Sequence, residues 1–197
     1  MGNELVNITV QVERVTHTKN EDNPHKLWVR LETDNGICSG NMTWIPKKNE
    51  ELLLIGEWSA WNGQKQFKFR KAKPYIPTTE KMLLHYACKL ADGFGDKLEA
   101  DIWGELGENW RELKAGQVKG VTTKKIAHFK EAIEYIRLNQ AQIDAKAFLV
   151  SKGITETDAE KAWKEWEMET VAKVTANCYC LTELKSVGFK KVDIGVR

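Results

Sequence analysis

Long apolar runs, paired cysteines and a secretion signal are all missing from this sequence of 197 residues. No stretch reaches the roughly 18 apolar residues of a membrane-spanning helix, so we expect no membrane partner. The first ten residues, MGNELVNITV, lack the basic segment and apolar core of a secretory signal. The four cysteines, at positions 38, 88, 178 and 180, form no zinc or disulfide framework. These features predict a cytoplasmic protein with reduced thiols and no metal or other cofactor.

A strong excess of charge is also missing. The formal net charge is +2, whereas dedicated nucleic-acid-binding domains are usually strongly basic. Local patches matter more than the total, and residues 65–73 include five basic residues and no acidic one. The content of 42% hydrophobic and 29% charged residues is typical of a globular protein with one large or two small domains.

The first third of the chain alternates apolar and polar residues, as half-buried strands do. Runs of this kind cover residues 5–15, 26–33, 37–42, 52–58 and 66–73. The hairpin signals Asp34-Asn35-Gly36 and Asn62-Gly63 each precede a returning strand. Five strands with no long helix between them predict a small OB-like β-barrel over residues 1–76.

The last of these strands has two contrasting faces. Alternation places Phe67 and Phe69 inside the barrel and Lys68 and Arg70 outside it. The two cations form either an ordinary solvated face or an electrostatic track for a phosphodiester chain.

Eight tryptophans must be divided between the core and possible stacking surfaces. Trp28 and Trp58 lie within strands, so we expect them in the core. Trp44 follows a strand, and Trp61 stands beside the Asn62-Gly63 turn, where burial is difficult. Trp44 and Trp61 are therefore candidates for stacking on nucleic-acid bases.

From Pro77 onwards the apolar spacing becomes helical. We expect helices over residues 79–91, from about 96 to 106, from 109 to about 117, from about 126 to 152, from 155 onwards and over 177–185. Capping boxes beginning at Asn109 and Thr155 mark two of the helix starts. The chain is therefore predicted to be an α+β protein of two domains, with an all-α domain over residues 77–197.

Three tight turns in the helical region resemble one another. Their sequences are DGFGDK at 92–97, KGVTTK at 119–124 and KSVGFK at 185–190. Each has an apolar residue in the middle and a lysine near the head of the next helix, whose backbone N–H groups suit a phosphate oxygen. The recurrence predicts tandem helix-hairpin-helix units that hold the DNA backbone, although each turn could instead be an ordinary helical corner. The candidate residues are Gly93, Gly95, Lys97, Gly120, Thr122, Thr123, Lys124, Lys125, Gly188, Lys190 and Lys191.

The order of these segments resembles the N-terminal region of RecD-type DNA helicases, in which an OB-like barrel precedes tandem helix-hairpin-helix units. The similar stretches include ITVQVERVT at 8–16, the turn and helix at 93–107, residues 119–126 and NCYCLTELKSVGFKKVD at 177–193. The resemblance implies a DNA-binding role in replication, recombination or repair.

Departures from the family pattern limit that role. The sequence has no Gly-x-x-x-x-Gly-Lys-Ser/Thr loop, so we expect no ATP-driven unwinding. Thr122 and Ser186 replace turn glycines, and Asp92 and Asp96 flank the first turn, where they would repel a phosphate. Every turn is therefore altered somewhere, and at least one of them could be purely structural.

Three functions remain open at this stage. The first is a non-enzymatic, largely sequence-independent binder of single-stranded or junction DNA. The second is an interaction module that docks on a helicase, a nuclease or a replication protein. The third is a base-excision enzyme with Lys97 or Lys124 as nucleophile, for which Gly116 and Asp144 occupy the positions where an aspartate is needed. The four histidines are scattered, and no residue pattern positively indicates catalysis.

Overall fold

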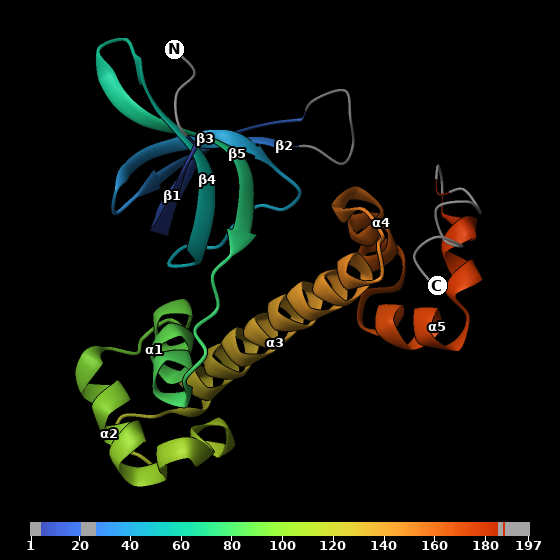
Figure 1. Cartoon of the computed structure of the whole chain (residues 1–197). Helices are drawn as coiled ribbons and strands as arrows, with labels where there is room; N and C mark the ends of the chain where they lie inside the picture. The colour runs from blue at the N-terminus through green and yellow to red at the C-terminus, as the bar shows by residue number, and fades with distance from the viewer. Residues whose placement is uncertain (1–4, 21–26, 185–186, 188–197) are drawn as a thin grey trace. The chain divides into compact units, whose positions relative to one another are not determined.

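Five strands at the start of the chain close into a barrel, shown in blue to green in the computed structural model of Figure 1. The structure describes residues 5–20, 27–184 and 187. The strands are β1 (Val6–Asn20), β2 (Leu27–Thr33), β3 (Gly36–Met42), β4 (Glu51–Trp61) and β5 (Gln64–Pro74). Their order around the barrel is β1-β2-β3-β5-β4, and β1 pairs with β4 to close it. The predicted closed barrel of five strands is therefore confirmed.

Strand β1 bends and pairs with two neighbouring strands. Residues 6–11 pair with β4, and residues 12–20 pair with β2. Irregularities in the β1–β2 register occur between Val12 and Arg14 and between Val15 and His17. Bulges of this kind increase the local bend and twist of a strand, which is what a small barrel needs in order to close.

The barrel core is formed by alternate side chains of all five strands. Phe67 and Phe69 are buried, and Lys68 and Arg70 are exposed, as the alternation predicted. Trp58 packs against this core and meets Phe67 edge-on, with 5.2 Å between ring centroids. The buried core residues are Val10, Val12, Val29, Leu31, Cys38, Met42, Leu52, Leu54, Phe67 and Phe69.

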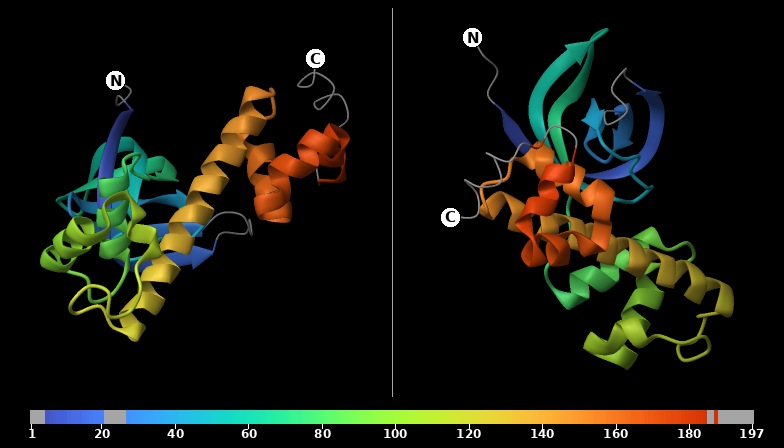
Figure 2. Two further views of the ribbon diagram at one scale, coloured as in Figure 1. Left: turned by 90° about the horizontal axis from the view of Figure 1, so that it is seen from below. Right: turned by 90° about the vertical axis from the view of Figure 1, so that its right-hand side faces the viewer.

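The chain becomes helical after β5, which confirms an α+β architecture with a barrel followed by helices. Helix α1 (Glu80–Leu90) begins at Thr79, whose side chain accepts a hydrogen bond from the Met82 N–H. Helix α2 (Asp96–Leu106) begins after Gly95, and Ile102 is its buried residue. Helix α3 (Thr123–Ser151) is one uninterrupted helix of 29 residues (Figure 2).

The segment between α2 and α3 differs from the sequence prediction. A 3-10 helix, η1 (Gly107–Glu112), replaces the expected helix from 109 to about 117. Asn109 lies inside η1 and does not cap it, and residues 113–122 form turns. Gly116 has a φ of 79°, so the backbone leaves the helical region before the predicted end of that helix. Gly120, with a φ of 91°, lies in the predicted second turn.

Backbone contacts divide the chain into two compact units, Met1–Ile133 and Glu134–Arg197. The second unit contains the end of α3, α4 (Glu156–Trp166), η2 (Glu167–Glu169), α5 (Thr170–Ala176) and η3 (Cys178–Glu183). The predicted cap at Thr155 is confirmed, because its hydroxyl accepts a hydrogen bond from the Asp158 N–H at 3.2 Å. In the part of the chain that the structure describes, no helix combines the length and apolarity needed to cross a membrane.

Candidate nucleic-acid interface

The outer face of the barrel carries two aligned rows of polar and aromatic residues. Register pairs Lys19 of β1 with Trp28 of β2, and Trp28 with Asn41 of β3. The next row runs from His17 through Arg30 and Ser39 to Lys68 of β5. Paired strands lie about 4.8 Å apart, so each row crosses the strands as a line of neighbouring residues, although Ser39 in the second row is buried.

Trp28 lies on this outer face, and its expected place in the core is wrong. The neighbouring positions Val29, Leu31 and Thr33 are buried, so the alternation of the strand turns Trp28 outwards. The His17 ring meets the half-buried Trp28 indole edge-on, with 5.6 Å between centroids. Sequence reasoning missed His17, Lys19, Trp28 and Arg30, although the buried alternation of Val29 and Leu31 was a signal that could have revealed Trp28 and Arg30.

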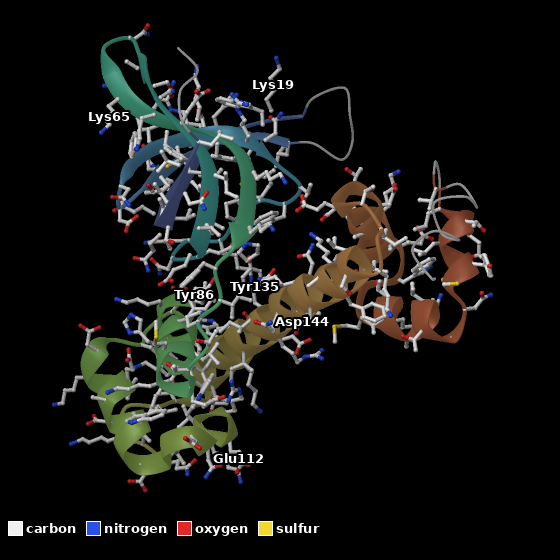
Figure 3. The ribbon with its side chains drawn as sticks, viewed as in Figure 1. Lys19, Lys65, Tyr86, Glu112, Tyr135 and Asp144 are labelled. Carbon is white, nitrogen blue, oxygen red and sulfur yellow. The ribbon has the colours of Figure 1, made fainter. Side chains whose placement is uncertain are left out.

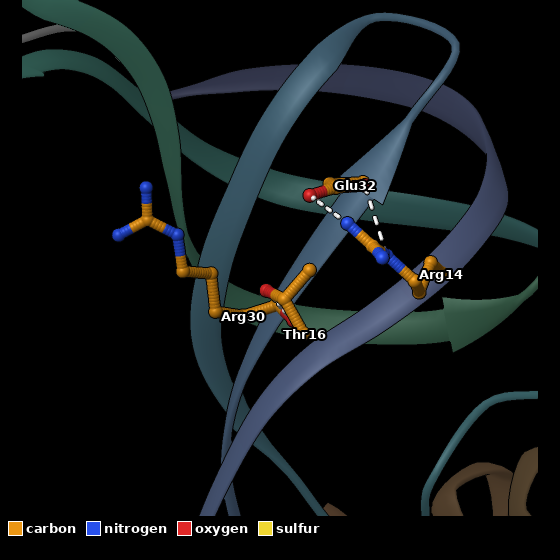
Figure 4. Close-up of polar contacts among 4 residues, drawn as sticks. All are labelled: Arg14, Thr16, Arg30 and Glu32. Carbon is orange, nitrogen blue, oxygen red and sulfur yellow. Dashed lines mark hydrogen bonds and ion pairs between the residues drawn. The ribbon is translucent and has the colours of Figure 1, made fainter.

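Arg14 and Arg30 lie close together on β1 and β2 but have different surroundings. Arg14 forms a bidentate pair with Glu32, at 2.9 and 3.2 Å, and this pairing raises the pKa of the guanidinium. Thr16 donates its hydroxyl proton to the Arg30 carbonyl, which ties the two strands together. Figure 4 shows the Arg30 guanidinium extending away from the Arg14–Glu32 pair, across the outer face.

The basic strand β5 contributes fewer free cations than its sequence suggests. Lys68 is exposed in the row with Arg30, but the Arg70 guanidinium lies 3.4 Å from the Glu57 carboxylate. Lys65 extends outwards near the tip of the β4–β5 hairpin, and its ammonium lies 4.2 Å from the centroid of the Trp58 ring (Figure 3). Lys68 and Lys65 are therefore the cations of β5 that are best placed for an anionic strand.

The two tryptophans predicted to stack on bases have different environments. Trp44 is half-buried, packs against the barrel core and donates its indole N–H to the fully buried Glu50 at 3.2 Å. The packing and the hydrogen bond together fix the position of the Trp44 ring against the barrel. Trp61 is the last residue of β4, and the structure does not describe its side chain.

The first predicted hairpin forms the turn between α1 and α2. Gly93 has a φ of 86°, and Gly95 is the extended residue immediately before α2. No described side chain caps the start of α2, so its first N–H groups have no side-chain acceptor there, and Lys97 is exposed in the same turn. Asp92 and Asp96 are exposed here too, and the Asp96 carboxylate lies 3.9 Å from the Lys89 ammonium.

The second predicted hairpin lies against the first. A Cβ at Gly93 would lie 3.2 Å from Lys125 Cε, and one at Gly120 would lie 4.0 Å from Leu98 of α2. Phe94 stacks on Phe129 of α3 with 5.0 Å between centroids, beneath the Lys125 ammonium. The structure therefore brings the two turns together into one surface.

The residues of the second hairpin have distinct tasks. Thr122 caps α3, because its hydroxyl accepts a hydrogen bond from the Lys125 N–H at 3.3 Å. The threonine that replaces the second turn glycine is therefore the N-cap of the helix. Thr123 and Lys124 are exposed in the first turn of α3, whereas Lys125 is half-buried. Of the third hairpin, Gly188, Lys190 and Lys191 lie outside the described residues, and Val187 is buried.

Neither Asp144 nor the buried thiol of Cys88 lies in surroundings that favour catalysis. Asp144 is exposed on α3, and its carboxylate accepts a hydrogen bond from Gln140 at 2.8 Å, which is unlike the buried site that a base-excision enzyme needs. Burial raises the pKa of the Cys88 thiol to about 12, which disfavours a reactive thiolate. Within the described ranges, no group of three or more candidate ligands could hold a metal ion.

Comparisons with known proteins add little to this geometry. No protein-family model matches the chain, and no curated protein matches it. A chain in the solved structure described as "Structure and Conformational Change of a Replication Protein A Heterotrimer Bound to ssDNA" is similar at 9% identity and a TM-score of 0.27. The match covers 42% of this chain and 64% of that one, less than two thirds of its length. A similarity of this size does not establish a shared fold, so the candidate interface rests on the contacts described above.

Proposed function

We propose that the protein is a non-enzymatic DNA-binding protein that holds a single strand across the outer face of an OB-type barrel with little sequence specificity. The observation that carries this proposal is the alignment of Trp28 with Lys19 and of His17 with Arg30 and Lys68. An aromatic ring beside a line of cations is how sequence-tolerant proteins bind single strands, because bases stack on the ring while cations contact the phosphates.

The two adjacent hairpins supply a second contact in this proposal. Helix-hairpin-helix units at Gly93–Gly95 and Gly120–Thr122 would offer backbone N–H groups to phosphates, with Lys97 and Lys124 adding charge. Such contacts position a duplex without reading its bases. A barrel for a single strand and hairpins for a duplex together favour a junction, which suits replication, recombination or repair.

Fluorescence anisotropy with single-stranded, duplex and forked DNA over a salt series tests the proposal. Trp28→Ala removes a stacking platform that contributes about 1–3 kcal/mol per base, so we expect single-strand affinity to fall about tenfold or more. Arg30→Glu/Lys68→Glu should weaken single-strand binding and flatten its dependence on salt, because fewer counterions are released. Lys97→Glu/Lys124→Glu should weaken duplex binding more than single-strand binding.

A matched control variant makes the same change in net charge at other exposed lysines. Lys48→Glu/Lys114→Glu alters the net charge equally at exposed positions that belong to neither barrel row and to neither hairpin, so DNA binding should change little. Unchanged binding by the Trp28 and Arg30/Lys68 variants, or equal losses in the control, would exclude the barrel face. No binding of any DNA form at low salt would end the DNA proposal.

Asp92 and Asp96 favour a second candidate function. Two exposed carboxylates beside the first hairpin oppose a phosphate, and Lys89 already lies near Asp96. An interaction module that docks on a helicase, a nuclease or another replication protein would not need that hairpin to bind DNA. Failure of every DNA form in the anisotropy series, with the fold intact by circular dichroism, would favour this alternative.

A further inference from the structure

In the second unit the chain bends between α4 and α5, at the 3-10 helix η2. We call this segment the acidic bend and define it as residues 165–173. The backbone turns at Glu167, whose φ of 43° lies in the left-handed region. Thr170 is fully buried beneath the bend, and its hydroxyl donates to the Glu167 carbonyl at 2.7 Å. Because this bond from a buried threonine holds the bend, the outer surface of the bend is preformed.

Apolar side chains project from this preformed surface. Met168 is 44% exposed and Val171 is 37% exposed, although they are only three residues apart. Trp166, the last residue of α4, is half-buried and packs against the core of the unit. Neighbouring exposed apolar residues on a held turn form a contact surface, whereas single exposed residues on a protein surface are ordinary.

Acidic residues surround these apolar side chains. Glu165, Glu167 and Glu169 are exposed, and Lys173 is the one cation within residues 165–173. Neither the Glu165 nor the Glu167 carboxylate has an ion-pair partner among the residues that the structure describes. Three carboxylates against one cation give the bend a net negative charge, which favours basic groups.

Lys173 shows how this surface accommodates a cation. Its ammonium lies 5.6 Å from the centroid of the Trp166 ring and 3.8 Å from the Glu169 carboxylate. A cation between an aromatic face and a carboxylate is held by both. The unpaired Glu165 and Glu167 offer the carboxylate half of the same arrangement to a cation from another molecule.

We propose that the acidic bend is a docking surface for a short basic amphipathic segment of a partner protein. The apolar side chains of the segment would cover Met168 and Val171, while its lysines or arginines would face Glu165 and Glu167. This inference concerns the second unit and does not depend on DNA binding by the barrel or by the hairpins. In such a complex, complementary charges would speed and orient the association. The apolar contact would then stabilise the bound state.

Peptide binding to the full chain tests the proposal. The probe is a fluorescein-labelled peptide of leucine and lysine at helical spacing, compared with a scrambled peptide of the same composition and with a leucine–glutamate peptide. We expect saturable anisotropy for the ordered basic peptide, and a loss of affinity of about tenfold or more in Glu165→Lys/Glu167→Lys and in Met168→Ser/Val171→Ser. Hydrogen exchange of residues 164–173 should slow when the peptide binds.

Matched controls and competing occupants complete the design. Glu105→Lys/Glu108→Lys and Leu138→Ser change exposed residues elsewhere and should leave peptide affinity unchanged. Equal binding of the scrambled peptide, unchanged affinity in both bend variants, or no slowing of exchange at the bend would overturn the proposal. Self-association that the bend variants abolish would overturn it too, because the occupant would then be a second copy of the chain.

Single-stranded DNA added to the peptide complex separates the two proposals. If the bend and the barrel face are independent, DNA should not displace the peptide. The bend variants should then bind DNA as the unaltered protein does, and the Trp28→Ala variant should bind the peptide normally. Loss of DNA binding alone would overturn the proposed function, and loss of peptide specificity alone would overturn the docking surface.

Discussion

Gly40 of β3 and Phe69 of β5 are register partners so close that a Cβ at Gly40 would lie 2.2 Å from the Phe69 carbonyl oxygen. On the other side of β5, Gly56 of β4 also pairs with Phe69, and a Cβ there would lie 2.6 Å from its Cα. Strand β5 therefore passes between two glycines at the point where the barrel closes. Phe69 is buried at this close approach, and the preceding residue, Lys68, is exposed.

We predict that Gly40→Ala and Gly56→Ala each destabilise the barrel strongly. The added methyl group would overlap backbone atoms, and overpacking in a closed core costs about 1–3 kcal/mol or more. Urea unfolding measures the cost. Gly104→Ala in α2 is the matched control, because no described atom lies within 4 Å of its added Cβ and alanine favours a helix by about 1 kcal/mol. If all three variants were equally stable, the two glycines would have no role in closing the barrel.

The barrel could be predicted from the sequence because each strand has a buried face that alternates with an exposed one. Val29, Leu31, Phe67 and Phe69 show that period directly. Alternation alone does not reveal which strands are neighbours, since register depends on pairing between distant segments. The row that joins His17, Arg30 and Lys68 could therefore not be predicted from the sequence, because it depends on the register of β1, β2, β3 and β5.

The helical region was predictable at its caps and not at its irregular segments. Thr79 and Thr155 begin helices as their hydroxyls suggest, since each accepts a backbone N–H. Asn109 has the same local signature but lies within η1, because Gly107 with a φ of 53° has already ended α2 and the next turn is too tight for an α-helix. A capping signature states a local preference that the surrounding packing can override.

The two glycines of the first hairpin should respond differently to substitution. Gly93→Ala places a Cβ at a φ of 86° and 3.2 Å from Lys125, so we expect a loss of about 1 kcal/mol or more in stability. Gly95 has a φ of −114°, and no described atom lies within 4 Å of its added Cβ, so Gly95→Ala should leave stability nearly unchanged.

Duplex affinity separates the roles of the same two positions. If the first N–H groups of α2 contact a phosphate, the methyl group of Gly95→Ala would hinder its approach and weaken duplex binding several-fold without loss of stability. Fluorescence anisotropy gives the duplex affinity of each variant, and urea unfolding of the same preparation gives its stability. Equal duplex affinity in Gly95→Ala and the unaltered protein would make this hairpin purely structural.

Glu80 should make stability depend on pH in the acidic range. A hydrogen bond from Arg111, with further help from Trp110, lowers the pKa of the Glu80 carboxyl from its usual value of 4.5. A lowered pKa in the folded state means that the carboxylate stabilises the fold above about pH 4.5 and that this stability is lost as the pH falls further. Glu80→Gln should therefore be less stable than the unaltered protein at pH 7, and the difference should shrink below pH 4.5 in urea titrations.

Glu80→Ala should cost more than Glu80→Gln at neutral pH. The indole N–H of the buried Trp110 donates to Glu80 at 2.9 Å, and losing that acceptor leaves a buried donor unpaired, at about 1–3 kcal/mol. Glu134→Ala is the control, because it removes a carboxylate paired with Arg137 on the surface of α3 without exposing any buried donor. Similar losses for Glu80→Ala and Glu134→Ala would show that the Trp110 bond contributes nothing.

Asn49 should couple the barrel to α1. Its side-chain N–H donates to the carbonyl of Lys89 at 2.6 Å, and that carbonyl belongs to the last turn of α1, where no further helical N–H is available. Asn49 also has a φ of 65°, which asparagine and glycine tolerate and alanine does not. Two variants separate these contributions. Asn49→Gly keeps the backbone and loses the bond, at about 1 kcal/mol, while Asn49→Ala adds about 1–2 kcal/mol of strain.

Hydrogen exchange in the last turn of α1 would show whether the bond joins the two elements. In Asn49→Gly, we expect faster exchange at residues 88–91, while the barrel strands keep their protection. Tyr86→Phe provides a second view of the same contact, because the Tyr86 hydroxyl accepts the Glu51 N–H beside Asn49 at 3.4 Å. If the loss in the double variant is smaller than the sum of the two separate losses, the two bonds depend on each other and belong to one contact. Unchanged exchange in α1 would mean that α1 is held by its apolar packing alone.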